Sequence, residues 1–386
     1  MTVTLKQGKE EVYTHSHPYT TLRTHLHAHL PHSGPLYRRI QYQISRPSPT
    51  ARVFASFDES QLSQGRETET QQPWLAAYVD IPRGPDTQIW LFSSVESETP
   101  AATTEYSREI VKSYLLSLFT HIQRNLVPDY ISSLPTTFKQ AAPTAVAEGV
   151  PKIPAHKPTS YLLGTVHTSL EALIIALSDE GRLAIHRGSG VHYVKYCFSS
   201  ESFGTVSLED IPNTNNNTTT EGRVSGYRFH DSTAKSGIQG HHIDLVKSRT
   251  NIPRSREALL AMGGVALYHS PQPVSSSEKE KEMPIGWAFL GFDGSLCSLH
   301  VEPEHRGRGL AGVVGREVMK RGVEVFEPRS SGNRGVDSGD TGGEEWFFAD
   351  VAVDNAASRR VMEKMGGVAG WRVAWLVVEV ENLESS

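Results

Sequence analysis

Residues 301–315 read Val-Glu-Pro-Glu-His-Arg-Gly-Arg-Gly-Leu-Ala-Gly-Val-Val-Gly, and they lead from an apolar strand through a glycine-rich basic turn into a helix. Glycines allow the backbone to curl so that several N–H groups point into one concavity, and the following helix adds the positive end of its dipole. Arg306 and Arg308 add positive charge, while Gly307 and Gly309 let a ligand approach the main chain. The stretch therefore predicts a binding site for an anion such as a polyphosphate.

A second strand and helix follow this turn. Residues 346–353, Trp-Phe-Phe-Ala-Asp-Val-Ala-Val, form an apolar run of strand length. The helix after the run has Asp354 as its expected N-cap and Gly366 as its expected end. The C-terminal part of the chain thus carries two consecutive strand–helix units.

These two units together resemble the GCN5-related N-acetyltransferase (GNAT) superfamily. The signature of that superfamily is Arg or Gln, two residues, Gly, one residue, then Gly or Ala, and Arg306, Gly309 and Ala311 match it. The family's Asn-x-x-Ser/Ala helix start corresponds to Asn355 and Ser358. Within the superfamily, the sequence is most similar to the branch of glycine N-acyltransferases and FR47-like proteins, and the resemblance covers residues 225–381.

The resemblance implies a fold, a co-substrate and a set of binding residues. The fold would be α/β (α+β), a mixed and mostly antiparallel sheet flanked by helices, and the co-substrate would be acetyl-CoA or another acyl-CoA. The strand before the turn would bind the pantetheine arm through the backbone of Leu299 and Val301. The remaining CoA-binding residues would be Arg306, Gly307, Arg308, Gly309, Leu310, Ala311, Asn355 and Ser358.

Length and composition favour two globular domains. The chain has 386 residues, of which 38% are hydrophobic and 21% charged. An Asn/Thr-rich polar stretch predicts a linker at residues 210–222, with an α/β domain at 1–209 and the GNAT domain at 223–386. The first domain has no glycine-rich turn, and two interpretations stay open: an unrelated α/β domain or a degenerate copy of the same fold.

Apolar patterns predict the individual elements. In the C-terminal part we expect strands at 223–230, 265–269, 285–292, 296–301, 346–353 and 371–380, two helical segments in 237–262, and helices at 310–326 and 355–365. In the N-terminal part we expect a hairpin of 74–80 with 88–95, a helix at 105–124, and apolar segments at 170–177 and 191–198. Loops are expected at 63–72, 210–222, 271–283 and 327–345.

Several classes of function are disfavoured. The net charge of −5 gives no basic field for nucleic acid, and no apolar run reaches the ~20 residues that span a bilayer. Two cysteines cannot build a disulfide framework, and an N-terminus without an apolar signal core predicts an intracellular, cytoplasmic location. Six histidines between residues 15 and 32 lack carboxylate or cysteine companions in a segment expected to be exposed, so we predict no metal site.

The catalytic side chains of the family are missing at their usual places. The glutamate base of glycine acyltransferases falls on Ser295, and the tyrosine that often acts as the acid falls on Met362. A serine hydroxyl is a poor base, and methionine has no titratable proton. A catalytically silent CoA-binding module is therefore one interpretation of this chain.

Three residues are candidates for the missing catalytic groups. Asp350 is an acid inside an apolar strand, where a charge needs a partner or a function. His300 precedes the turn, and strand alternation places it on the face opposite Leu299 and Val301. Ser295 is retained because it occupies the base position. Transfer without any protein base also stays open, since the amine can arrive already deprotonated.

The sequence predicts an acyl-CoA-dependent N-acyltransferase. The expected reaction is direct attack of an amine on acetyl-CoA in a ternary complex, and the expected acceptor is a small molecule or an amino acid. The alternatives are a protein lysine or N-terminal acetyltransferase and the silent CoA-binding module. The oligomeric state is not predicted.

Overall fold

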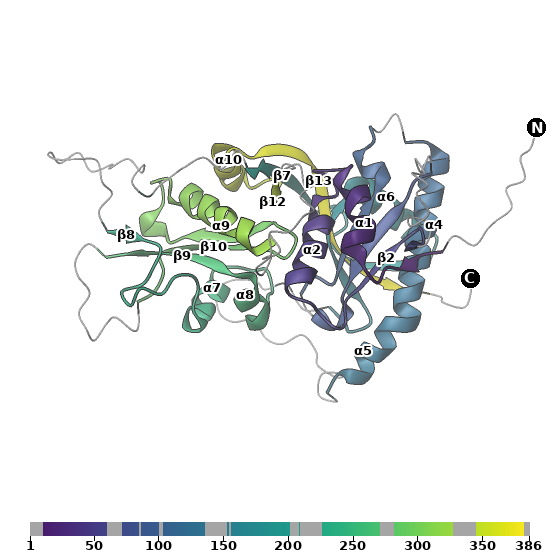
Figure 1. The fold of residues 1–386 in the computed structure, drawn as a ribbon, viewed down its shortest axis with the longest axis horizontal. Helices are drawn as coiled ribbons and strands as arrows, with labels where there is room; N and C mark the ends of the chain where they lie inside the picture. Colours follow the sequence, from purple (N-terminus) through teal and green to yellow (C-terminus); the bar gives the residue numbers. More distant parts are fainter. Residues whose placement is uncertain are drawn as a thin grey trace, which may run out of the picture. The chain divides into compact units, whose positions relative to one another are not determined.

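The computed structural model describes residues 11–59, 72–84, 86–99, 103–135, 153, 156–200, 208, 226–270, 282–326 and 345–381. The chain forms two compact units (Figure 1). Unit 1 comprises Met1–Thr144, Pro154–Tyr193 and Arg372–Ser386, and unit 2 comprises Ala145–Ile153 and Val194–Trp371. The four expected loops lie almost wholly outside the described residues.

Unit 1 contains a mixed sheet. Its strands are β1 (Tyr13–Thr14), β2 (Arg52–Ala55), β3 (Leu75–Val79), β4 (Ile89–Ser93), β5 (Tyr161–His167), β6 (Leu183–Arg187) and the C-terminal part of β13 (Val368–Val380). The order is β1-β2-β3-β4-β5-β13, with β6 also paired to β13. The described pairs are antiparallel except β4 with β5, which is parallel.

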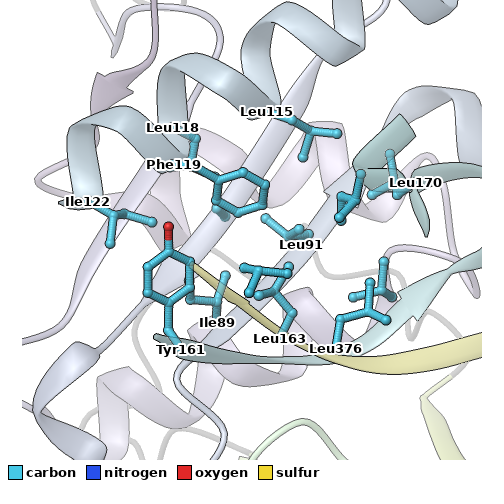
Figure 2. Packing of buried hydrophobic residues seen from close by; sticks show 14 of the residues in the cluster. Ile89, Leu91, Leu115, Leu118, Phe119, Ile122, Tyr161, Leu163, Leu170 and Leu376 are labelled. Atoms are coloured by element: carbon cyan, nitrogen blue, oxygen red, sulfur yellow. The ribbon is translucent and has the colours of Figure 1, made fainter. Parts of the chain in front are cut away.

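Helices cover both faces of this sheet. On one face, α4 (Glu105–His121) and α6 (Thr168–Asp179) pack their leucines and Phe119 onto Leu91, Leu163 and Leu376 of the strands (Figure 2). A π-helix (Ile122–Leu126) and α5 (Val127–Ser133) continue α4. On the other face, α1 (Pro18–His27) and α2 (Gly34–Ser45) contribute Leu22, Leu26, Leu36 and Ile40 to a second apolar cluster.

Unit 2 has its own antiparallel sheet of β8 (Tyr227–Arg228), β9 (Gly264–His269), β10 (Gly286–Leu290) and β11 (Leu296–Val301). Next to β11 comes β12 (Trp346–Ala352), joined by a parallel bridge, and β12 neighbours β7 (His192–Ser199). The helices are α7 (Ile243–Ser248), α8 (Arg256–Met262), α9 (Leu310–Phe326) and α10 (Ala356–Lys364). Met262 of α8 and the N-terminal half of α9 contact opposite faces of β11, through Cys297 and Leu296 respectively.

The two units repeat one order of elements. In unit 1 the order is α1, α2, β2, β3, β4, α4, β5, α6, and in unit 2 it is α7, α8, β9, β10, β11, α9, β12, α10. In each unit three antiparallel strands are followed by a helix and a strand parallel to the third. This repetition supports the degenerate copy, and the mixed fold flanked by helices is confirmed. The first copy has no glycine between β4 and α4.

Neither unit is one contiguous segment of the chain, whereas the sequence predicted the contiguous domains 1–209 and 223–386. Most of β7, from the first half of the sequence, belongs to unit 2, whereas β13 continues from unit 2 into unit 1. Each unit therefore includes a strand that follows the last helix of the other copy. A sequence pattern predicts that a strand exists but not which sheet receives it.

Most predicted elements of the C-terminal part are confirmed, and β11 and α9 have the predicted bounds. The expected N-cap Asp354 was wrong, because Asn355 accepts the N–H of Ser358 at 3.0 Å and caps α10. The expected end is confirmed by Gly366, whose φ is +91°. The two residues compete for the same role, and only the one with a side-chain oxygen near the third helical N–H fulfils it.

The expectation of an exposed N-terminal histidine segment holds for His17 and His27 but was wrong for the segment as a whole. Residues 18–27 and 34–45 are helices, and His15 is 3% exposed with its Nε2 2.9 Å from the carbonyl oxygen of Phe57. His25 stacks on Phe57 at 4.9 Å between ring centroids. The histidines occur between the leucines of an amphipathic stripe, which their polarity and the nearby prolines concealed in the sequence.

One histidine in unit 1 predicts a pH-dependent stability. His167 caps α6, because its Nδ1 accepts the N–H of Ser169 at 3.1 Å. Burial, followed by the nearby charge of His32, lowers the pKa of His167 to about 4. Neutral His167 therefore contributes fully to the stability of the folded protein above pH 6.5, where the imidazole of the unfolded chain is also neutral. This contribution is lost as the pH falls from 6.5 towards 4, by at most about 1.4 kcal/mol per pH unit.

The variant His167→Asn keeps a capping oxygen but does not titrate. We expect its thermal midpoint to fall less steeply than that of the wild type between pH 6.5 and 4, and to match it near pH 7.5. The exposed His17→Asn variant is the control and should follow the wild type. Equal slopes for all three proteins contradict the assigned role.

Candidate functional site

A β-bulge interrupts β11 in unit 2. Trp287 pairs with His300 and Phe289 with Cys297, so the single residue Ala288 lies opposite two residues of β11. One of these two, Ser298, has φ +51°, in the left-handed region. A bulge of this kind bends its strand and redirects the groups that follow it.

The backbone beyond the bulge faces the outer edge of β11. The N–H of Glu302 donates to the carbonyl of Ile285 at 2.8 Å, and His300 pairs with Trp287, so the even-numbered residues point to β10. Alternation then directs the backbone groups of Leu299 and Val301 away from β10.

At that outer edge the neighbouring strand β12 pairs only briefly. In the described part of the chain the two strands share one bridge, Ser295 with Phe348, next to a 3.0 Å hydrogen bond from the N–H of Phe348 to the carbonyl of Gly294. Both contacts lie at the start of β11. The two strands therefore separate towards the end of β11, which leaves an edge that an extended ligand can extend as an added strand.

The glycine-rich turn presents a row of amides at the start of α9. The N–H of Arg306 donates to the carbonyl of Pro303, and the N–H of Gly312 donates to the carbonyl of Gly309. Among the described residues, the five amides of residues 307–311 between them donate to no backbone carbonyl. Gly307 and Gly309 both have φ +77°, and a Cβ on either one would meet nothing within 4 Å. We call residues 306–311 the anion cradle.

The two arginines of the anion cradle have different partners. Nε of Arg306 donates to the carbonyl of Val301 at 2.8 Å, which ties the turn to the end of β11. Nη1 of Arg308 donates to the hydroxyl of Tyr227 at 2.9 Å, and that hydroxyl lies 2.9 Å from Nδ1 of His305. Burial, followed by the charge of Arg308, lowers the pKa of His305.

The anion cradle fits a pyrophosphate. Successive amides at a helix N-terminus, open space over two glycines and adjacent guanidinium groups are the arrangement that binds phosphate oxygens through main-chain N–H groups. The edge of β11 leads directly into the cradle through Val301. CoA, which joins an amide-bearing arm to a pyrophosphate, has the matching order of groups.

The second predicted CoA segment lies at the start of α10. Asn355 and Ser358 are linked by the capping hydrogen bond, so the asparagine oxygen serves the helix. At its other end, α10 lies close to α9. A Cβ added to Gly315 of α9 would lie only 2.6 Å from Cε of Met365, at the end of α10. Small residues on α9 therefore allow the two helices to pack beside each other.

Two positions that carry catalytic groups in the resembling family are occupied by structural residues here. The hydroxyl of Ser295 donates to Oδ2 of Asp293 at 3.0 Å, and the Ser295 N–H donates to Oδ1, so both groups stabilise the β10–β11 turn. Met362 is 3% exposed within α10. Neither residue presents a proton acceptor for an amine.

His300 is placed differently. Its ring stacks on Trp287 at 4.6 Å between centroids, on the same face of the sheet as Cys297, whose Sγ lies 3.9 Å from Sδ of Met262 in α8. Its Nε2 is buried, and its closest partner in the described part of the chain is the carboxylate of Glu302, at 3.5 Å. Burial lowers the pKa of His300 although Glu302 raises it, so the imidazole is neutral near pH 7 and can accept a proton.

Asp350 forms a buried ion pair. Its Oδ1 lies 2.6 Å from Nζ of Lys195, and the two side chains are 8% and 1% exposed. Nζ of Lys195 also lies 5.4 Å from the ring centroid of Phe348. A lysine partner in the interior answers the question of why an acid occurs in an apolar strand.

Lys195 and Ser298 were missed in the sequence. Lys195 lies in β7, in the run His-Tyr-Val-Lys-Tyr-Cys-Phe-Ser, where a lysine among apolar strand residues signals a buried acidic partner. Ser298 gives no such signal, because a bulge depends on the register between two strands.

Comparisons with known proteins address the N-terminal half and the fold. Residues 9–196 match a family model described as the acyl-CoA N-acyltransferase verG N-terminal domain. A search of curated proteins gives no match. A crystal structure of a Drosophila protein is similar at 13% identity, covering 97% of this chain and 99% of that one, with a TM-score of 0.53.

Two further solved structures are more distant. A tandem GNAT protein from the clavulanic acid biosynthesis pathway has 11% identity, covers 97% of this chain and 99% of its own, and gives a TM-score of 0.41. A GCN5-related N-acetyltransferase from Sphaerobacter thermophilus has 12% identity, covers 83% and 85%, and gives 0.35. Among the described residues, no helix combines the length and apolarity needed to cross a bilayer.

Proposed function

We propose that this chain is an acyltransferase of the GNAT superfamily, in the FR47-like branch, and that it transfers an acetyl group from acetyl-CoA to the amine of a small molecule or an amino acid. The observation that carries the proposal is the continuous path from the outer edge of β11 into the anion cradle. It offers the backbone of Leu299 and Val301 to an extended amide-bearing arm and five amides to a pyrophosphate. These groups support the binding of the acyl donor.

The acceptor approaches from the face of β11 that carries His300. On the opposite face Leu296 packs near Gly315 of α9, and the N-terminus of α9 belongs to the anion cradle. The amine nitrogen attacks the thioester carbon, the C–S bond breaks, and CoA leaves as its thiolate. We assign the acceptance of the amine proton to Nε2 of His300, directly or through one water molecule.

A guanidinium on the same face supports an acceptor that carries a carboxylate. Arg254, in the α7–α8 loop, has a buried Nε without a hydrogen-bond partner among the described residues, and its Nη1 lies 3.9 Å from Sδ of Met262. Cys297 contacts the same sulfur. Because a buried guanidinium N–H is costly when unpaired, a ligand oxygen is its natural partner.

The proposal is tested by binding followed by transfer. Calorimetry with acetyl-CoA should show stoichiometric binding, and thiol release should then be detected with a panel of amines that includes glycine and glycinamide as a matched pair. Faster release with glycine supports a carboxylate-bearing acceptor. Release only with peptides would identify a protein acetyltransferase, and binding without release under any amine would identify a silent CoA-binding module. The intracellular location stays a prediction from the sequence.

A further inference from the structure

Ser298 combines two unfavourable features in one residue. Its φ of +51° is a conformation that glycine adopts readily and serine rarely. Its Oγ is buried and, in the described part of the chain, has no hydrogen-bond partner. A glycine at this position could adopt the same φ without the steric cost and would carry no hydroxyl, so the bulge itself does not require a serine. Strain that persists in this way is characteristic of functional sites.

The position of Ser298 indicates what its hydroxyl serves. The residue belongs to the bulge where β11 bends, beyond the single bridge that joins β11 to β12. It immediately precedes Leu299, whose N–H faces the outer edge of the strand. A serine oxygen and the next amide nitrogen are separated by few bonds, so both can donate to one acceptor oxygen.

We propose that the Ser298 hydroxyl and the Leu299 N–H together bind the carbonyl oxygen of the acyl thioester. This inference rests on the proposed acyl transfer. As the amine nitrogen bonds to the carbonyl carbon, the oxygen gains negative charge, and both donors strengthen their hydrogen bonds to it. When the C–S bond breaks, the oxygen becomes an amide carbonyl and the charge leaves with sulfur. Ser298 keeps its proton throughout.

Two substitutions separate the hydroxyl from the backbone strain. Ser298→Ala removes the hydroxyl and keeps the strained conformation, whereas Ser298→Gly removes both. We expect each variant to lower kcat about 100-fold, the effect typical of one lost oxyanion donor. Ser298→Gly should also raise the thermal midpoint by about 2–4 °C, because the strain is relieved. A more stable but slower enzyme is not expected from damage to the fold.

Ala234 provides a matched control. It is another residue of unit 2 with a positive φ, +63°, and it lies in the exposed loop before α7. Ala234→Gly should raise the thermal midpoint similarly and leave kcat unchanged. A loss of kcat in this control would show that relief of strain alone slows the reaction, and it would overturn the role of the hydroxyl.

A binding measurement tests the inference without turnover. Only acetyl-CoA has the thioester carbonyl, so wild-type protein should bind acetyl-CoA more tightly than CoA in calorimetry. Both Ser298 variants should reduce this ratio of affinities several-fold and leave the affinity for CoA unchanged. In the Ser298 variants, the infrared stretching frequency of the bound thioester carbonyl should lie closer to its value in water than it does in the wild type. An unchanged ratio and stretch overturn the inference, whereas a wild type that shows this ratio but transfers to no amine overturns only the proposed acyl transfer.

Discussion

Gly309→Glu is expected to abolish the binding of acetyl-CoA, raising the dissociation constant by at least two orders of magnitude. A Cβ on Gly309 would meet no protein atom within 4 Å, so a longer side chain would extend into the space that we assign to the phosphate. A glutamate there adds a negative charge beside the amides that would receive the pyrophosphate. Calorimetric titration with acetyl-CoA measures the loss.

Gly181→Glu is the matched control for this variant. Gly181 has φ +70°, also has nothing within 4 Å of a Cβ, and follows α6 in unit 1. The two substitutions therefore impose a similar backbone cost of about 1 kcal/mol. If Gly309→Glu binds acetyl-CoA as the control does, the pyrophosphate has been assigned to the wrong place.

The second large effect concerns stability. Lys195→Met is expected to destabilise unit 2 by about 3–5 kcal/mol, because it leaves the carboxylate of Asp350 buried without its cation. Thermal unfolding at pH 7.5 measures the loss. Lys195→Met combined with Asp350→Leu should recover most of it, since two apolar side chains replace the ion pair without a buried charge.

The double variant also decides between two candidate bases. If the Lys195–Asp350 pair is structural, the double variant folds and retains acyl transfer, while His300→Gln lowers kcat by at least 100-fold. The activity of the wild type should also fall as the pH drops below the lowered pKa of His300, because the protonated imidazole cannot accept a proton. A folded double variant without activity would instead assign the base to Asp350.

The elements of the C-terminal copy were largely predictable. The bounds of β11 and α9 follow from an apolar run, a proline and a glycine-rich turn that are adjacent in the chain. The turn at 291–295 is likewise encoded locally, by Gly294 with φ +75° and an aspartate that accepts the Ser295 N–H. Features of this kind depend on a few neighbouring residues, so a single sequence is enough to predict them.

The active groups around this frame were only partly predictable. The sequence indicated Asp350 and His300 as candidates, and only the structure shows their partners: Asp350 has a lysine at 2.6 Å, and the imidazole of His300 has the carboxylate of Glu302 at 3.5 Å. The helices α1 and α2 were missed because histidines and prolines weaken an amphipathic pattern that becomes clear only when Leu22 and Leu26 pack on the sheet.

By itself, the sequence determined the order of the elements in unit 2 and the glycine-rich turn of residues 306–311, since each depends on residues close together in the chain. Tertiary structure alone decided the bulge at Ser298, the pairing of Lys195 with Asp350 and the continuation of β13 into unit 1. The physical reason is that strand register and the burial of a charge are set by contacts between segments far apart in sequence. No local pattern encodes them.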